Sequence, residues 1–180
     1  MTEILFVRHG ETDWNVERRV QGHSDRPLNA TGKAQARKLA TELRRECLDA
    51  IYASDLARAR ETAQAVAEQH GLEVEVLPAL REKHFGTWEG LLDTEIRERF
   101  PQANGGPWGD GETSEEVNER VLSALHDIAA RHPGGRVLVV SHGGPLRAVL
   151  RHCDAGGDEH IANCHVARIG FRDGNLISLD

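Results

Sequence analysis

The stretch ILFVRHGETDWN, residues 4–15, decides how the rest of the chain is interpreted. Its first four residues are apolar, and a short continuous apolar run is typical of a strand buried on both faces of a sheet. Arg8 and His9 follow directly, and Gly10 comes next. Ionisable side chains are costly to bury without a partner. Their place at the end of a buried strand therefore needs an explanation, although one such pair alone does not distinguish a binding site from packing.

A second apolar run, residues 137–140, ends in the same way, with Ser141, His142, Gly143 and Gly144. Ligands of open α/β sheets bind beyond the carboxyl ends of the parallel strands. We therefore expect His9 and His142 at one edge of a sheet. One histidine at a strand end is usually a packing or surface residue, but two such strand ends favour a site.

A third strand, predicted at residues 50–53, is followed by Ser54 and Asp55, and Arg58 falls in the first turn of the next helix. The N-terminus of a helix favours anions, and arginine binds oxyanions in a forked geometry. Arg8, Arg58 and the two histidines together suit a tetrahedral oxyanion such as phosphate.

The remaining pattern predicts an α/β fold. Apolar residues recur at helical spacing over residues 36–47, 56–67 and 117–128, residues 72–76 alternate as in a half-exposed strand, and Asp173-Gly174 is a hairpin signal. Thr113 and Glu116 form a capping box before the third of these helices. We expect a three-layer α/β/α structure, whose mostly parallel sheet has an antiparallel edge strand.

Length and charge limit the kinds of protein this can be. The 180 residues predict a single domain over 1–180, and the net charge of −7 disfavours nucleic acid as a partner. No apolar run approaches the ~18 residues of a membrane span, and residues 1–8 lack the pattern of a signal peptide. We expect a cytoplasmic monomer or homodimer that binds neither nucleic acid nor membrane.

Cysteine and histidine residues near the C-terminus raise a zinc site as an alternative. They are His152, Cys153, His160, Cys164 and His165. No CxxC or HxxxH pair anchors them, and adjacent ligands suit tetrahedral geometry poorly. With three cysteines in all, the chain also lacks a disulfide framework. We expect no metal and no other cofactor.

These motifs resemble the histidine phosphatase superfamily, in its phosphoglycerate mutase-like branch. The resemblance covers nearly the whole chain in family order, and the RHG and SHG segments are its most specific parts. It is carried by LFVRHGETDWN (residues 5–15), RVQGHSDRPLNATGKAQA (19–36), YASDLARARETA (52–63), LREKHFGTWEG (80–90) and VLVVSHGGPLRAVL (137–150).

The resemblance implies a role for each of five catalytic residues. His9 is the nucleophile that becomes phosphorylated, Arg8, Arg58 and His142 hold the phosphate, and Glu82 is the proton donor. A neutral imidazole can attack phosphorus if its other nitrogen is held, for instance by nearby backbone. Charge on the transferring oxygens is offset by the two arginines and by His142, which we expect to be protonated.

Four further residues are implied as substrate-binding residues. Asn15 and the Gly143 backbone are supporting donors, and Gln21 and Gly22 belong to a loop that borders the pocket. The implied reaction is hydrolysis of a small phosphorylated metabolite through a phosphohistidine, of the broad-specificity or α-ribazole phosphatase type, with a sugar phosphate, a phosphorylated nucleoside or a phospho-acid as substrate.

Two alternatives stay open. The first is a cofactor-dependent phosphoglycerate mutase, which the short chain, the few cations between Glu82 and Thr113, and Phe85 in place of the mutases' tyrosine disfavour. The second is a non-catalytic module that binds phosphate or phosphoprotein, which the intact motif set disfavours. The glycine-rich loop 101–112 is either a lid or a connector.

Tryptophans offer a further hypothesis about the leaving group. Trp14, Trp88 and Trp108 lie in predicted loops near the motifs. They either wall a partly apolar leaving-group pocket or pack the loops together, since aromatic side chains bury a large area in both cases.

Overall fold

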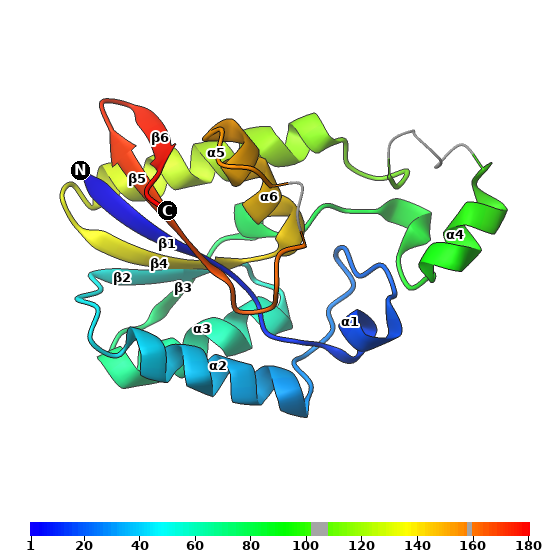
Figure 1. Ribbon diagram of the computed structural model, residues 1–180, viewed down its shortest axis with the longest axis horizontal. Helices are drawn as coiled ribbons and strands as arrows, with labels where there is room; N and C mark the ends of the chain where they lie inside the picture. Colours follow the sequence, from blue (N-terminus) through cyan, green and yellow to red (C-terminus); the bar gives the residue numbers. More distant parts are fainter. Residues whose placement is uncertain (102–107, 158–159) are drawn as a thin grey trace.

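The computed structural model describes residues 1–101, 108–157 and 160–180, which form a three-layer α/β/α structure (Figure 1). Its six-stranded sheet has the order β3-β2-β4-β1-β5-β6. The strands are β1 (Thr2–Arg8), β2 (Ala50–Ala53), β3 (Val74–Val76), β4 (Arg136–Ser141), β5 (Val166–Arg172) and β6 (Asn175–Ser178). Strands β1 to β4 run parallel, which confirms the predicted fold class.

The antiparallel part of the sheet is a hairpin at one edge, as predicted. Strand β5 runs antiparallel to β1, and β6 pairs antiparallel with the outer side of β5 and forms the edge. The turn between them holds Asp173 and Gly174 at φ 52° and 81°. Positive φ at both central residues is what a two-residue hairpin of type I′ requires.

Helices cover both faces of the sheet, so strand side chains of both parities are buried. Ile4 and Phe6 of β1 pack on one side with residues of α5 (Ser114–Arg131) and α6 (Gly143–His152). Leu5 and Val7 pack on the other side with α2 (Ala30–Leu43) and α3 (Ala57–His70). This explains why the apolar run at residues 4–7 shows no alternation.

Local signals define where the helices begin. The predicted capping box at Thr113 and Glu116 is present at the start of α5. Four short elements were not predicted from the sequence, because one or two helical turns give too little periodicity to detect. They are α1 (Asp13–Glu17), the 3₁₀ turns η1 (Pro78–Leu80) and η2 (Gly86–Trp88), and α4 (Asp93–Arg99). None of the described helices is long and apolar enough to cross a membrane.

Candidate active site

The two histidine-bearing strand ends meet, as the sequence predicted. Strands β1 and β4 are neighbours, with Arg8 opposite Ser141 in the register, so the next residue of each strand faces the same space. The rings of His9 and His142 lie with centroids 5.1 Å apart in an edge-on arrangement. Both side chains are buried.

His9 is held in one tautomer by the backbone. Its Nδ1 lies 2.6 Å from the carbonyl oxygen of Gly10 and must donate to it, which leaves the Nε2 lone pair free. Burial, followed by the charges of Arg58 and Arg8, holds the pKa of His9 well below its ordinary value of 6.5. The ring is therefore neutral at neutral pH. The expected backbone contact of this imidazole is present.

Arg58 belongs to the first turn of α3 and is 1% exposed. Its Nη1 donates to Ser24 O at 2.9 Å and its Nη2 donates to Gly22 O at 2.7 Å. Burial lowers the pKa of Arg58 to about 10, although the charge of Glu82 opposes this effect. The side chain is thus a cation, and it is fixed by the backbone of the loop that the family resemblance places beside the pocket.

Four buried nitrogens at this place have no hydrogen-bond partner within the described protein. They are Nε of Arg8, Nε of Arg58, and both ring nitrogens of His142. Arg8 also donates from Nη1 to the carbonyl of Ile161, which fixes its guanidinium. Buried donors are normally paired. Unpartnered donors on three neighbouring side chains are a cluster that an anion can satisfy.

His142 differs from the expectation of a protonated ring. Burial, followed by the charges of Arg58 and of nearby groups, holds the pKa of His142 well below 6.5. A neutral His142 carries one N–H and can donate a single hydrogen bond. An anionic ligand beside it would favour the protonated form, because an opposite charge within a few ångströms stabilises the imidazolium.

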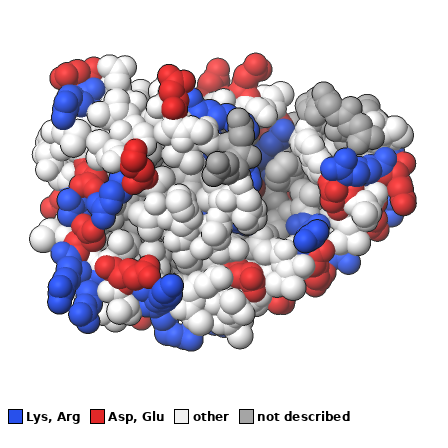
Figure 2. All heavy atoms as spheres, viewed as in Figure 1, with Lys and Arg blue, Asp and Glu red and all other residues white. Residues whose placement is uncertain are grey.

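A cavity of about 190 Å³ opens beside His9. It is lined by Arg8, His9, Asn15, Arg19, Gln21, Gly22, Arg58, Glu82, Phe85, Gly143, Arg147 and His160. Eight of the nine predicted residues are in this lining, and the ninth, His142, lies against His9. Acidic and basic side chains are mixed over the face of the molecule shown in Figure 2, and no broad basic patch covers that face.

Glu82 reaches the cavity from the segment between η1 and η2. Its Oε2 accepts a hydrogen bond from Gly144 N at the start of α6 at 3.0 Å, and its Oε1 accepts one from Lys83 N at 2.8 Å. A Cβ at position 144 would lie 2.1 Å from Glu82 Oε1. The absence of a side chain at Gly144 is therefore what permits this approach.

Asn15 and Gln21 are fixed through one hydroxyl group. Thr12 Oγ1 lies 3.1 Å from Asn15 Oδ1 and 2.9 Å from Gln21 Oε1. Asn15 Oδ1 also accepts from Thr12 N at 3.1 Å and from Asn163 Nδ2 at 3.4 Å. With its oxygen occupied, Asn15 can offer its amide hydrogens to the cavity.

Sequence reasoning missed Arg19, Arg147 and His160 as lining residues. Arg147 lies four residues after Gly143, one helical turn along α6, and this spacing could have revealed it. It makes no ion pair or hydrogen bond with the described residues, so its charge is available to a ligand. His160 precedes β5 in a segment without any helical or strand pattern, so no signal marked it.

The suggested zinc ligands do not form a cluster. Cys153 packs against the apolar residues on the α5 side of the sheet, and Cys164 packs on the opposite side. Burial, followed by Glu42, raises the pKa of Cys164 to about 12, which disfavours the thiolate. Within the described ranges, no three His, Cys, Asp or Glu side chains are arranged to hold a metal.

The tryptophans pack loops together. Trp88 stacks on Phe100 with centroids 4.8 Å apart and meets Trp108 edge-on at 5.6 Å, while Trp14 lies under Arg26. None of the three is among the residues that line the cavity. Phe85 is the aromatic residue there. The question of a lid falls partly on residues 102–107, which lie outside the described residues.

A family model described as histidine phosphatase superfamily (branch 1) matches residues 4–178. The chain belongs to this superfamily. Members of this superfamily act through a phosphohistidine. The resemblance inferred from the motifs is thereby confirmed.

Within the superfamily, the chain is similar to both phosphatases and mutases. It is 39% identical over 185 residues to the metal-independent phosphoserine phosphatase of Arabidopsis thaliana, with 96% of this chain and 78% of that protein covered. It is 38% identical over 186 residues to the probable phosphoglycerate mutase GpmB of Enterobacter sp. (strain 638), covering 96% and 86%. The solved structure of Bacillus stearothermophilus YhfR matches with a TM-score of 0.91 at 34% identity, covering 99% and 96%.

Proposed function

We propose that this histidine phosphatase hydrolyses small phosphomonoesters, with His9 as the nucleophile and Glu82 as the proton donor. The observation that carries the proposal is the arrangement around His9. Its Nδ1–H is held by Gly10 O, and unpartnered nitrogens of Arg8, Arg58 and His142 surround it. A nucleophile with a free lone pair is thus placed among donors that suit phosphate oxygens.

In the first step, the Nε2 lone pair of His9 attacks phosphorus, and the bond from phosphorus to the ester oxygen breaks. The electron pair of that bond leaves with the oxygen, and Glu82 in its acid form donates a proton to it, so that an alcohol departs. Arg8, Arg58 and His142 offset the charge on the three transferring oxygens. The product is a phosphohistidine at His9.

In the second step, water attacks the phosphohistidine from the side that the alcohol has left. Glu82, now a carboxylate, takes a proton from the water as the new bond to phosphorus forms and the bond to His9 breaks. Inorganic phosphate leaves and the neutral imidazole returns. All of the charge that this scheme needs is supplied by protein side chains, so we expect turnover to persist in chelator and to be inhibited by vanadate.

The substrate we favour carries a second anionic group. Arg147 lines the cavity as a cation with no hydrogen bond or ion pair to the described residues, and its charge is close enough to lower the pKa of Arg8 after burial and Glu82 are counted. A carboxylate on the leaving group could pair with it. Phosphoserine, the substrate named for the Arabidopsis relative, has such a carboxylate.

The test is to trap the intermediate. The enzyme is mixed with a labelled phosphomonoester and quenched in alkali, in which phosphohistidine survives, and the labelled peptide is mapped. We expect label on His9, none in His9→Ala, and less in His142→Ala. Label on Ser54, Ser141 or a cysteine would disprove the assignment of the nucleophile. Binding of phosphate without any label or turnover would instead indicate a binding module.

The same proposal separates hydrolysis from mutase chemistry, because both pass through the same intermediate. NMR can follow free phosphate and the 2- and 3-phosphoglycerate isomers together, with bisphosphoglycerate supplied. We expect phosphate release to dominate, since the described part of the site offers few cations for a second phosphate. Isomerisation faster than phosphate release would make this protein a mutase.

A further inference from the structure

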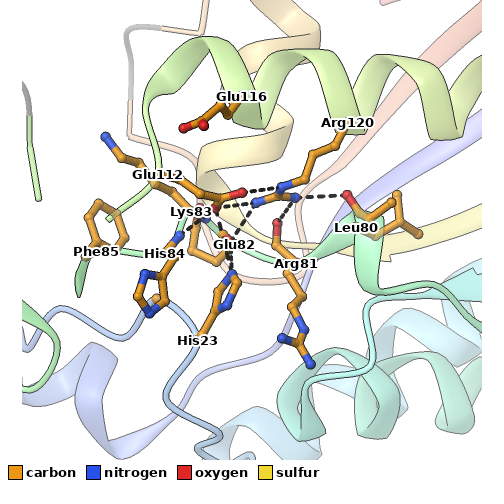
Figure 3. A network of polar contacts seen from close by, with 12 residues as sticks. His23, Leu80, Arg81, Glu82, Lys83, His84, Phe85, Glu112, Glu116 and Arg120 are labelled. Atoms are coloured by element: carbon orange, nitrogen blue, oxygen red, sulfur yellow. Dashed lines mark hydrogen bonds and ion pairs between the residues drawn. The ribbon is translucent and has the colours of Figure 1, made fainter. Parts of the chain in front are cut away.

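The main chain that carries Glu82 is held by one side chain of α5. Arg120 Nη1 donates to Ala79 O at 2.9 Å and to Arg81 O at 2.7 Å, and its Nη2 donates to Glu82 O at 2.9 Å (Figure 3). Glu82 lies between the 3₁₀ turns η1 and η2, so no helix or strand fixes its backbone. The guanidinium of Arg120 holds this backbone instead.

Arg120 is itself held by Glu112 in a paired geometry. Its Nε donates to Glu112 Oε1 at 2.7 Å and its Nη2 donates to Oε2 at 2.8 Å. Glu112 Oε2 also accepts from His84 N at 2.7 Å, and Glu112 N donates to His84 O at 2.9 Å. Both side chains are about one-fifth exposed. Arg120 and Glu112 together thus hydrogen-bond to the main chain before and after Glu82 (Figure 3).

The electrostatics agree with a permanent ion pair. Burial alone would raise the pKa of Glu112, but the hydrogen bonds from Arg120 and from His84 N outweigh it and hold that pKa below its usual value. His23 supports the same carbonyl, because its Nε2 donates to Glu82 O at 2.9 Å. Arg120 Nη2 and His23 Nε2 therefore converge on one backbone oxygen of the proposed proton donor.

Arg120 does not reach the reacting atoms. It is absent from the lining of the cavity beside His9, and each of its three guanidinium nitrogens is engaged with protein atoms. Apart from its charge, which contributes to the lowered pKa of His142, Arg120 can affect the reaction only through the segment that it holds. A shift of about 1 Å in a reacting group can cost on the order of 100-fold in rate.

We propose that Arg120, clamped by Glu112, is a positioning residue that keeps the Glu82 carboxyl group at the mouth of the phosphate site. The inference rests on the proposed role of Glu82 as proton donor. It adds a specific consequence: loss of Arg120 should harm the step in which Glu82 protonates the leaving group, and should spare reactions that need no proton.

The experiment measures formation of the phosphoenzyme with two leaving groups. Phosphoserine releases an alkoxide that needs a proton, whereas p-nitrophenyl phosphate releases a phenolate that needs little help. For Arg120→Met we expect the pre-steady-state rate with phosphoserine to fall roughly 10- to 100-fold. The burst rate with p-nitrophenyl phosphate should change much less. Arg120→Lys keeps the charge without the fork and should resemble Arg120→Met.

A double-mutant cycle separates positioning from general damage. Glu82→Gln alone should cost roughly 10²–10⁴-fold with phosphoserine. If Arg120 acts through Glu82, adding Arg120→Met to Glu82→Gln should cost almost nothing more. Arg131→Met is the matched control, because Arg131 lies on the same helix and makes a bidentate pair with Glu75 on the surface. It should leave both substrates unaffected.

Each other outcome has a definite meaning. Equal losses for both substrates in Arg120→Met, or additive losses in the double variant, would overturn the positioning role. If Arg120→Met unfolds, Glu112→Gln, which keeps the size of the side chain, is put through the same comparison and must show the same leaving-group dependence. If Glu82→Gln itself shows no such dependence, the proposed role of Glu82 fails, and this result is distinguishable because it appears without any change at Arg120.

Discussion

His9 and His142 lie side by side, yet their ring nitrogens differ in their hydrogen-bond partners. His9 has one nitrogen fixed by Gly10 O, whereas both nitrogens of His142 lack a partner in the described structure. The first arrangement fixes a tautomer and leaves Nε2 free, as the proposed role of His9 as nucleophile requires. The second leaves the protonation state of His142 to be set by what binds. A ligand dianion and a proton should therefore enter the site together.

This coupling can be measured with sulfate, which stays a dianion at neutral pH. The pKa of His142 is well below 6.5 without a ligand, so at pH 7 the free ring is neutral, and a bound dianion favours the imidazolium. We expect sulfate binding to take up as much as about one proton per site. Calorimetry in buffers of different ionisation enthalpy gives that number. His142→Gln should remove most of the uptake, and an unchanged uptake would place the proton elsewhere.

Arg147 leads to a prediction about specificity. A hydrogen bond between charged groups contributes about 1.5–3 kcal/mol when sheltered, and Arg147 is only half-buried. Its loss should then raise KM for phosphoserine roughly tenfold. For Arg147→Met we expect little change with p-nitrophenyl phosphate, which has no carboxylate. Comparable losses for both substrates would show that Arg147 acts on the phosphate itself.

At the scale of elements, helix α5 carries two features: a capping box that stabilises its first turn, and Arg120, the proposed positioning residue. Its first turn is closed by Thr113 and Glu116, each bonding to the other's backbone N–H. Thr113→Ala should lower the free energy of unfolding by about 1 kcal/mol, the usual contribution of an N-cap side chain. Thermal unfolding measures this loss. The leaving-group dependence of the rate should stay normal, because Arg120 lies almost two turns further along the helix.

The elements that the sequence revealed and those it hid differ in a physical way. Strands at residues 4–7 and 137–140 were predictable, since burial on both faces demands continuous apolar runs. The positions of His9 and His142 at the edge of the sheet were predictable from the ends of these two strands. The Arg120–Glu112 pair was not predictable. It joins a helix to an irregular segment, and such a contact leaves no period in the sequence.

At the scale of the whole molecule, the arginines of the candidate site lie within a protein whose net charge is negative. A net charge of −7 favours release of an anionic product into solution, and the buried arginines at the site are held by backbone carbonyls more than by carboxylates. The family and the mostly parallel sheet could both be inferred from the sequence. The side-chain protonation states could not, because they depend on burial that only the folded chain defines.

Burial of neutral histidines also predicts how the stability of the molecule depends on pH. The pKa values of His9 and His142 in the folded protein are well below the 6.5 of the unfolded chain. Below pH 6.5 the unfolded state therefore binds protons that the folded state does not. Each such group lowers the free energy of unfolding by about 1 kcal/mol per pH unit until its folded pKa is reached.

Urea unfolding between pH 7 and pH 5 tests this expectation. The carboxyl groups with lowered pKa, such as Glu3 and Glu112, start from 4.5 in the unfolded chain and contribute only at still lower pH. His23 adds a smaller effect of the same sign, since burial lowers its pKa as well. Replacing His9 and His142 by Asn and Gln should flatten the slope. Saturating sulfate should also reduce it, because the bound dianion restores the proton affinity of His142. A slope that neither change reduces would mean that acid destabilises the protein through other groups.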